Sequence, residues 1–157
     1  MRRTEDPIRP AVHRRIAADL FNLTWSLLDR PARTPEEADE LVHAAHASRY
    51  HWGRVGTARN RSIGEWQISR VYATLGRAEP ALYHGRRALE LALRHHLGRF
   101  YVAYGYEALA RGASLTRDRG SRNRYLRQAR RLAPLIRDPD DRRMLLEDLE
   151  TIPHRKA

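Results

Sequence analysis

The chain has 157 residues, the length of one domain that can bury a hydrophobic core without cross-links. Its 41% hydrophobic and 31% charged residues are typical of a folded helical protein and not of a disordered one. It has no cysteine, which excludes disulfides, thiolate metal sites and cysteine nucleophiles. No apolar run is long enough for a signal peptide or a membrane span, so we expect a cytoplasmic protein.

The formal net charge of +11 comes almost entirely from arginine, because Lys156 is the only lysine among the 30 basic residues. This near-complete replacement of lysine indicates a codon bias towards G and C. A positive field attracts polyanions at low salt, but the charge by itself does not identify a nucleic-acid partner.

Helical periodicity dominates the chain, and strand patterns are almost absent, which predicts an all-α fold. The first helix is expected over about 10–29, with Leu20, Leu23 and Leu27 on one apolar stripe. The second is expected over about 34–52, with Thr34 as N-cap and Glu37 completing a capping box. Its expected inward stripe consists of Ala38, Leu41, Val42, Ala45 and Trp52.

The second helix contains the histidine-rich stretch LVHAAHASRYHW. His43, His46 and Tyr50 share one helical face, and His51 points elsewhere. Two histidines three positions apart supply only part of a metal site, and a further ligand would have to come from Glu65 or His84. We therefore expect no metal, and histidines that bond to backbone or carboxylate groups at the border of the core. A polar ligand-binding use is the alternative.

The third and fourth helices are expected over about 62–76 and 78–96, the third opening with a Ser62–Glu65 capping box. Along these helices, large apolar, small, aromatic and turn positions are filled in order by Ile68, Ser69, Tyr72, Gly76, Ala81, Ala88 and Leu89. This segment, about 62–95, resembles a tetratricopeptide repeat. The resemblance implies a superhelix of antiparallel helices and binding of a protein or peptide in a concave groove, without catalysis. It also implies that Ala81 and Ala88 are buried where the two helices cross.

The remaining helices are expected over about 99–116, 121–136 and 138–150, giving seven in a single domain spanning 1–157. Segment 98–133 matches the repeat more weakly: Ala103, Tyr106 and Ala129 fit, but the turn is longer and Arg122 replaces a small residue. An irregular helical bundle is the alternative architecture.

The sixth expected helix carries a strip of arginines, with Arg124, Arg127 and Arg131 on one face. Such a strip suits phosphate groups, so a basic helical nucleic-acid-binding protein is one alternative function. The other interpretation is a solvated face whose arginines pair with carboxylates. These would be Asp118, Asp138, Asp140 and Asp141.

Aromatic, basic and hydrogen-bonding residues concentrate on the second and third expected helices. The candidate binding residues are His46, Tyr50, His51, Trp52, Glu65, Trp66 and Arg70. No catalytic motif accompanies them, so the sequence favours a non-enzymatic protein- or peptide-binding adaptor without a cofactor. A helical protein that binds a metal or small ligand through these residues is a further alternative.

Overall fold

The computed structural model describes residues 6–154, and 80% of these described residues are helical. In chain order the helices are α1 (Pro10–Leu28), α2 (Pro35–Val55), α3 (Ala58–Thr74), α4 (Ala78–Arg94), α5 (Arg99–Ser114), α6 (Arg119–Leu132), the 3₁₀ turn η1 (Ala133–Leu135) and α7 (Pro139–Glu150). No strand occurs in residues 6–154, which confirms the all-α prediction. None of the described helices is both long enough and apolar enough to cross a membrane.

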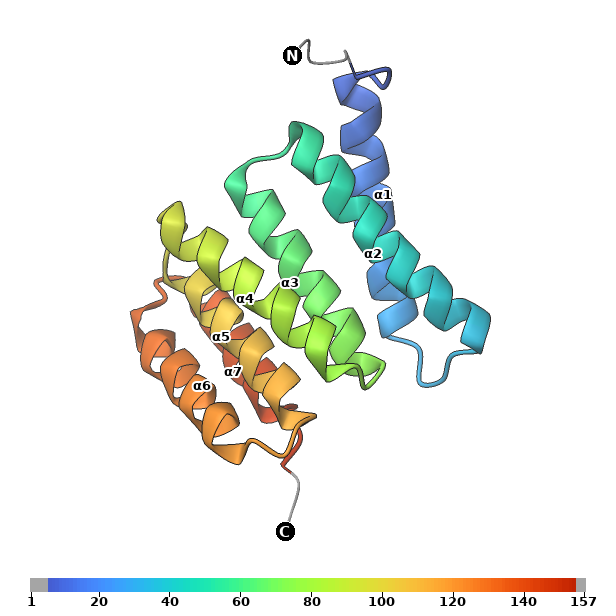
Figure 1. Ribbon diagram of the computed structural model, residues 1–157. Helices are drawn as coiled ribbons and strands as arrows, with labels where there is room; N and C mark the ends of the chain where they lie inside the picture. Colours follow the sequence, from blue (N-terminus) through green and yellow to red (C-terminus); the bar gives the residue numbers. More distant parts are fainter. Residues whose placement is uncertain (1–5, 155–157) are drawn as a thin grey trace.

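The helices form two layers, with the chain passing back and forth between them (Figure 1). Consecutive helices from α1 to α6 pack against one another, and α7 packs on α5 and η1. The odd-numbered helices also contact each other, α3 with α5 and α5 with α7, whereas α2, α4 and α6 do not pack together to a similar extent within the described chain. The odd helices therefore form the tighter, inner layer and the even helices the outer layer. This arrangement is compatible with a helical repeat.

The α3–α4 crossing is made by small side chains. Ala81 and Ala88 are 0% and 2% exposed, which confirms their expected burial. The hydroxyl of Ser69 donates to the carbonyl of Ala81 over 2.7 Å, and that of Ser62 donates to the carbonyl of Ala88 over 3.0 Å. These bonds satisfy hydroxyls that lie in a closely packed interface, where an unpaired polar group would be costly.

The expected start of α3 at a Ser62–Glu65 capping box is wrong. The helix begins at Ala58, one turn earlier, with Thr57 and Asn60 forming the capping box. Ser62 and Glu65 then lie inside the helix, and both are buried. The sequence fits both starts, because each offers a hydroxyl and a side-chain acceptor three positions apart.

The expected inward stripe of the second helix is only partly correct. Leu41 and Ala45 are buried as predicted, but Ala44 and Ser48 complete the buried face, whereas Trp52 is half-buried. The remaining expected members, Ala38 and Val42, are also half-buried. The face shifts because α2 packs against both α1 and α3, and Ser48 donates to the carbonyl of Ala17 over 2.7 Å.

Candidate functional site

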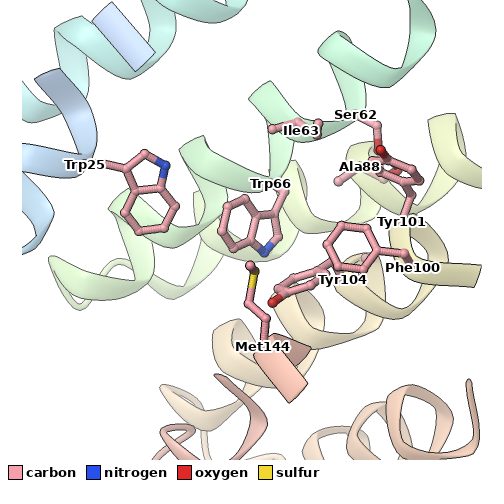
Figure 2. Close-up of a pocket in the computed structure, with 10 residues that line it drawn as sticks. Trp25, Ser62, Ile63, Trp66, Ala88, Phe100, Tyr101, Tyr104 and Met144 are labelled. Atoms are coloured by element: carbon pink, nitrogen blue, oxygen red, sulfur yellow. The ribbon is translucent and has the colours of Figure 1, made fainter. Parts of the chain in front are cut away.

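The inner layer contains an apolar cavity of about 310 Å³. Its walls come from all four odd helices and from α4. The lining residues are Trp25, Ser62, Ile63, Trp66, Ala88, Phe100, Tyr101, Tyr104, Gly105 and Met144 (Figure 2). A concave site formed by several helices and lined by aromatic side chains is the commonest form of a binding pocket in helical proteins.

A row of aromatic rings forms one wall of this cavity. Trp25 and Trp66 have ring centroids 5.5 Å apart, Trp66 meets Tyr104 edge-on at 5.2 Å, and Tyr104 lies 4.9 Å from Phe100. Met144 extends from α7 towards Trp66 (Figure 2) and is 50% exposed at the rim. The rigid rings define the shape of the wall, and the flexible thioether adapts to what enters.

A buried ionic network lies beside this wall. The Glu107 side chain, on a fully buried residue, accepts a hydrogen bond from the Trp66 indole over 2.9 Å and another from Arg111 over 2.7 Å. Arg70 approaches Glu107 at 3.4 Å and donates to Asp148 of α7 over 3.0 Å. Carboxylates from α5 and α7 thus hold guanidinium and indole groups from α3 and α5, which fixes the orientation of Trp66.

The Tyr104 hydroxyl belongs to the same network, donating to Asp148 over 2.7 Å. Burial, followed by the hydrogen bond and the negative charge of Asp148, raises the pKa of this phenol far above its usual value. Tyr104 is therefore neutral at physiological pH and presents its ring, not a base, to the cavity.

A second polar cluster lies between α2, α3 and α4. Glu65 accepts from Arg49 over 2.9 Å and is 2.7 Å from Nδ1 of His84, while His46 Nε2 lies 2.9 Å from the Tyr72 hydroxyl. The rings of His46 and His84 are 5.3 Å apart. No three histidine, aspartate or glutamate side chains in residues 6–154 are arranged to hold a metal ion. Hydrogen bonds join Glu65 to Arg49 and His84, and His46 to Tyr72, across the three helices.

Two pKa values in this cluster move in ways that favour the neutral histidine and the ionised glutamate. Burial, with a smaller effect of nearby His84, lowers the pKa of His46. Burial alone would raise the pKa of Glu65, but the hydrogen bond from His84 and the charge of Arg49 outweigh it and lower that pKa.

Tyr50 and His51 lie in a third place, near the start of α1. His51 Nδ1 is 2.6 Å from Nδ1 of buried His13, whose Nε2 is 3.0 Å from Asp6. Tyr50 is 59% exposed and packs its ring edge-on against His51. These contacts join the N-terminal end of α1 to the C-terminal half of α2.

Trp52 lines a smaller hollow of about 180 Å³ between α1, α2 and α3. Its other lining residues are Ala18, Phe21, Asn22, Asn60 and Ile63. Ile63 also lines the aromatic cavity, so the two hollows adjoin along α3.

The seven residues expected to bind a ligand therefore fall into four places, not one. Trp66 lines the inner cavity, and the guanidinium of Arg70 lies 5.6 Å from the centroid of the Trp66 ring. His46 and Glu65 belong to the polar cluster between α2, α3 and α4. Sequence reasoning missed Trp25, Phe100, Tyr104 and Met144 as members of one site. Their signal in the sequence was a large apolar side chain on each odd helix, which local periodicity does not distinguish from an ordinary core residue.

Comparisons with known proteins identify no relative of this chain: no family model, no curated protein and no solved structure matches it. The class of protein is therefore defined by the fold alone, which over residues 6–154 is an all-α array of seven helices compatible with a helical repeat.

Proposed function

We propose that the chain is a non-enzymatic, cytoplasmic adaptor of tetratricopeptide-like type that binds a peptide segment of another protein in the groove of its inner layer. The observation that carries this proposal is the apolar cavity between Trp25, Trp66, Phe100, Tyr104 and Met144. A volume of about 310 Å³ lies at the small end of ligand pockets. It suits one or two large side chains of a peptide better than a bulky cofactor.

The chemistry of the lining supports binding over catalysis. The Ser62 hydroxyl, the only aliphatic hydroxyl among the residues that line the cavity, donates to the Ala88 carbonyl. The Tyr104 hydroxyl donates to Asp148, and its pKa is raised. The Ser62 hydroxyl is bonded to a backbone carbonyl, which is not a base, and the raised pKa of Tyr104 keeps its hydroxyl protonated beside Asp148. Neither group is therefore activated as the nucleophile that covalent catalysis requires.

The charge around the cavity favours an acidic partner. Arg59 lies over the Tyr101 ring at 5.4 Å from its centroid, and the whole chain carries a net charge of +11. Tryptophan, tyrosine and arginine are the residues that most often dominate the binding energy of protein interfaces. The expected partner is a segment with an aromatic or large aliphatic anchor flanked by aspartate or glutamate.

Peptide selection with two matched variants of α7 tests this proposal. Met144 and Leu146 are both exposed, at 50% and 42%, but only Met144 lines the cavity. Peptides from a random displayed library are selected on the wild-type protein and measured by fluorescence anisotropy. We expect Met144→Glu to weaken their binding at least about 10-fold, because it places a charge at an apolar rim, and Leu146→Glu to leave it unchanged.

Two outcomes would overturn the proposal. One is that no peptide is enriched over a control selection without protein. The other is that enriched peptides bind wild type and both variants equally, which would place their site outside the groove. Circular dichroism of both variants checks that the helical fold is retained.

A further inference from the structure

The outer side of α6 presents a row of exposed arginines. Arg124, Arg127 and Arg131 are all exposed and recur at positions that share one face of the helix. The opposite face is buried through Leu126 and Ala129 against the rest of the core. The row spans about 10 Å along the helix, from the rise of 1.5 Å per residue.

These arginines are not neutralised by carboxylates. No described aspartate or glutamate lies within salt-bridge distance of Arg124, Arg127 or Arg131, whereas neighbouring Arg130 pairs with Glu150 at 3.1 Å. Arg124 is held instead by the Ser121 hydroxyl at 3.0 Å and lies over the Tyr125 ring at 5.6 Å. Between positions 117 and 137 the sequence has a single acidic residue, Asp118. Pairing with nearby carboxylates, which was one interpretation of this strip, therefore does not occur at Arg124, Arg127 or Arg131 in the described structure.

The chemistry of the strip distinguishes between three possible partners: a membrane surface, a protein and nucleic acid. Insertion of a helix into a membrane surface uses an apolar face, and the apolar face of α6 is already buried in the protein. A protein interface has an apolar or aromatic centre, which the outward positions of α6 lack. Exposed guanidinium groups along one helix face match a chain of phosphates, which arginine binds through paired hydrogen bonds.

We propose that the outer face of α6 binds the phosphate backbone of nucleic acid without reading its sequence. This surface lies on α6, which contributes no residue to the lining of the aromatic cavity. It does not depend on the peptide-binding proposal, so either can fail without the other.

Two triple variants with the same change of net charge test the proposal. The first is Arg124→Gln/Arg127→Gln/Arg131→Gln. The control is Arg14→Gln/Arg86→Gln/Arg94→Gln, which removes three exposed arginines from α1 and α4 that have no carboxylate partner among the described residues. Binding of a fluorescent RNA duplex, a DNA duplex and vesicles rich in anionic lipid is measured by anisotropy or sedimentation as salt is raised.

We expect wild type and the control to bind both duplexes similarly and to lose affinity steeply with salt. Each phosphate contact contributes about 0.9 to the slope of log K against log salt, so the α6 variant should lose about 2.7 of that slope. The α6 variant should bind more weakly than wild type at low salt. Between about 0.05 and 0.2 M salt, the factor by which its affinity falls should be about 40 times smaller than the factor for wild type.

Three results would overturn the proposal. The α6 variant and the control could lose affinity equally, which would show diffuse attraction by net charge. Wild type could fail to bind either duplex at low salt. Binding to the vesicles alone would assign the strip to a membrane surface.

Discussion

Replacing Glu107 by glutamine tests whether the buried ionic network holds the inner layer together. The carboxylate is in contact with Arg70, Arg111 and the indole of Trp66. Glutamine has the same size but no charge and only one acceptor oxygen. The substitution therefore removes the carboxylate partner of Arg111 and one of the two carboxylate partners of Arg70, while leaving the volume of the core unchanged.

The expected cost follows from the burial of the partners. Removing one member of a buried ion pair costs about 3–5 kcal/mol, since the other is left without compensation. The side chains of Arg70 and Arg111 are 16% and 11% exposed, so water solvates part of their charge. We therefore expect a loss near the lower limit, about 3 kcal/mol, from a total stability of about 5–15 kcal/mol for a domain of this kind.

Urea denaturation followed by far-ultraviolet circular dichroism measures this loss. Glu90→Gln is the matched control, because its partner Arg87 is three positions away on the exposed side of α4. Such a surface pair contributes less than about 1 kcal/mol. If Glu107→Gln is as stable as Glu90→Gln, the network does not hold α3, α5 and α7 together.

Two further predictions concern the outer half of the array. Ala88→Leu should lower the free energy of unfolding by about 1–3 kcal/mol, because the larger side chain overpacks the α3–α4 crossing. Ala11→Leu, at an exposed position of α1, is the control. A denaturation midpoint for Ala88→Leu equal to that of the control would contradict the close packing. The lowered pKa of His46 means that the unfolded state binds more protons, so stability should fall as pH drops through 6.5 towards the lower folded value. Glu65, whose pKa is also lowered, should add a second loss as pH falls below 4.5. Denaturation midpoints measured across this range should show a smaller first step in His46→Gln, with the remainder from His51, whose pKa burial also lowers. A first step of unchanged size in this variant would contradict the contribution of His46.

Much of the secondary structure could be predicted from local patterns. The starts of α2 and α7 follow from an N-cap residue and a proline in the first turn, both of which act within a few positions of the chain. The start of α3 could not be decided in this way, because Thr57 and Ser62 offer equivalent caps. Packing decided it, since Ser62 and Glu65 are buried between helices.

The candidate site could be predicted only in part. Trp66 and Arg70 stood out because aromatic, basic and hydrogen-bonding residues concentrate on the second and third helices, and the structure places both on the inner layer. Tyr50 and His51 stood out for the same reason, yet they pack against the start of α1. Composition within one hairpin does not distinguish these cases, because neighbouring helical positions point in different directions.

Periodicity, capping and side-chain size act locally, so they are enough to predict that the chain is helical and where small residues permit helices to cross. Which side chains share a cavity depends instead on how the helices pack. Trp25, Trp66, Tyr104 and Met144 are far apart in the chain and meet because the odd-numbered helices stack in one layer. Helix packing also decided the role of Glu107, an ordinary helical glutamate in the sequence, which is fully buried among two arginines and an indole. Such long-range contacts depend on how the layers pack, and no local pattern encodes that.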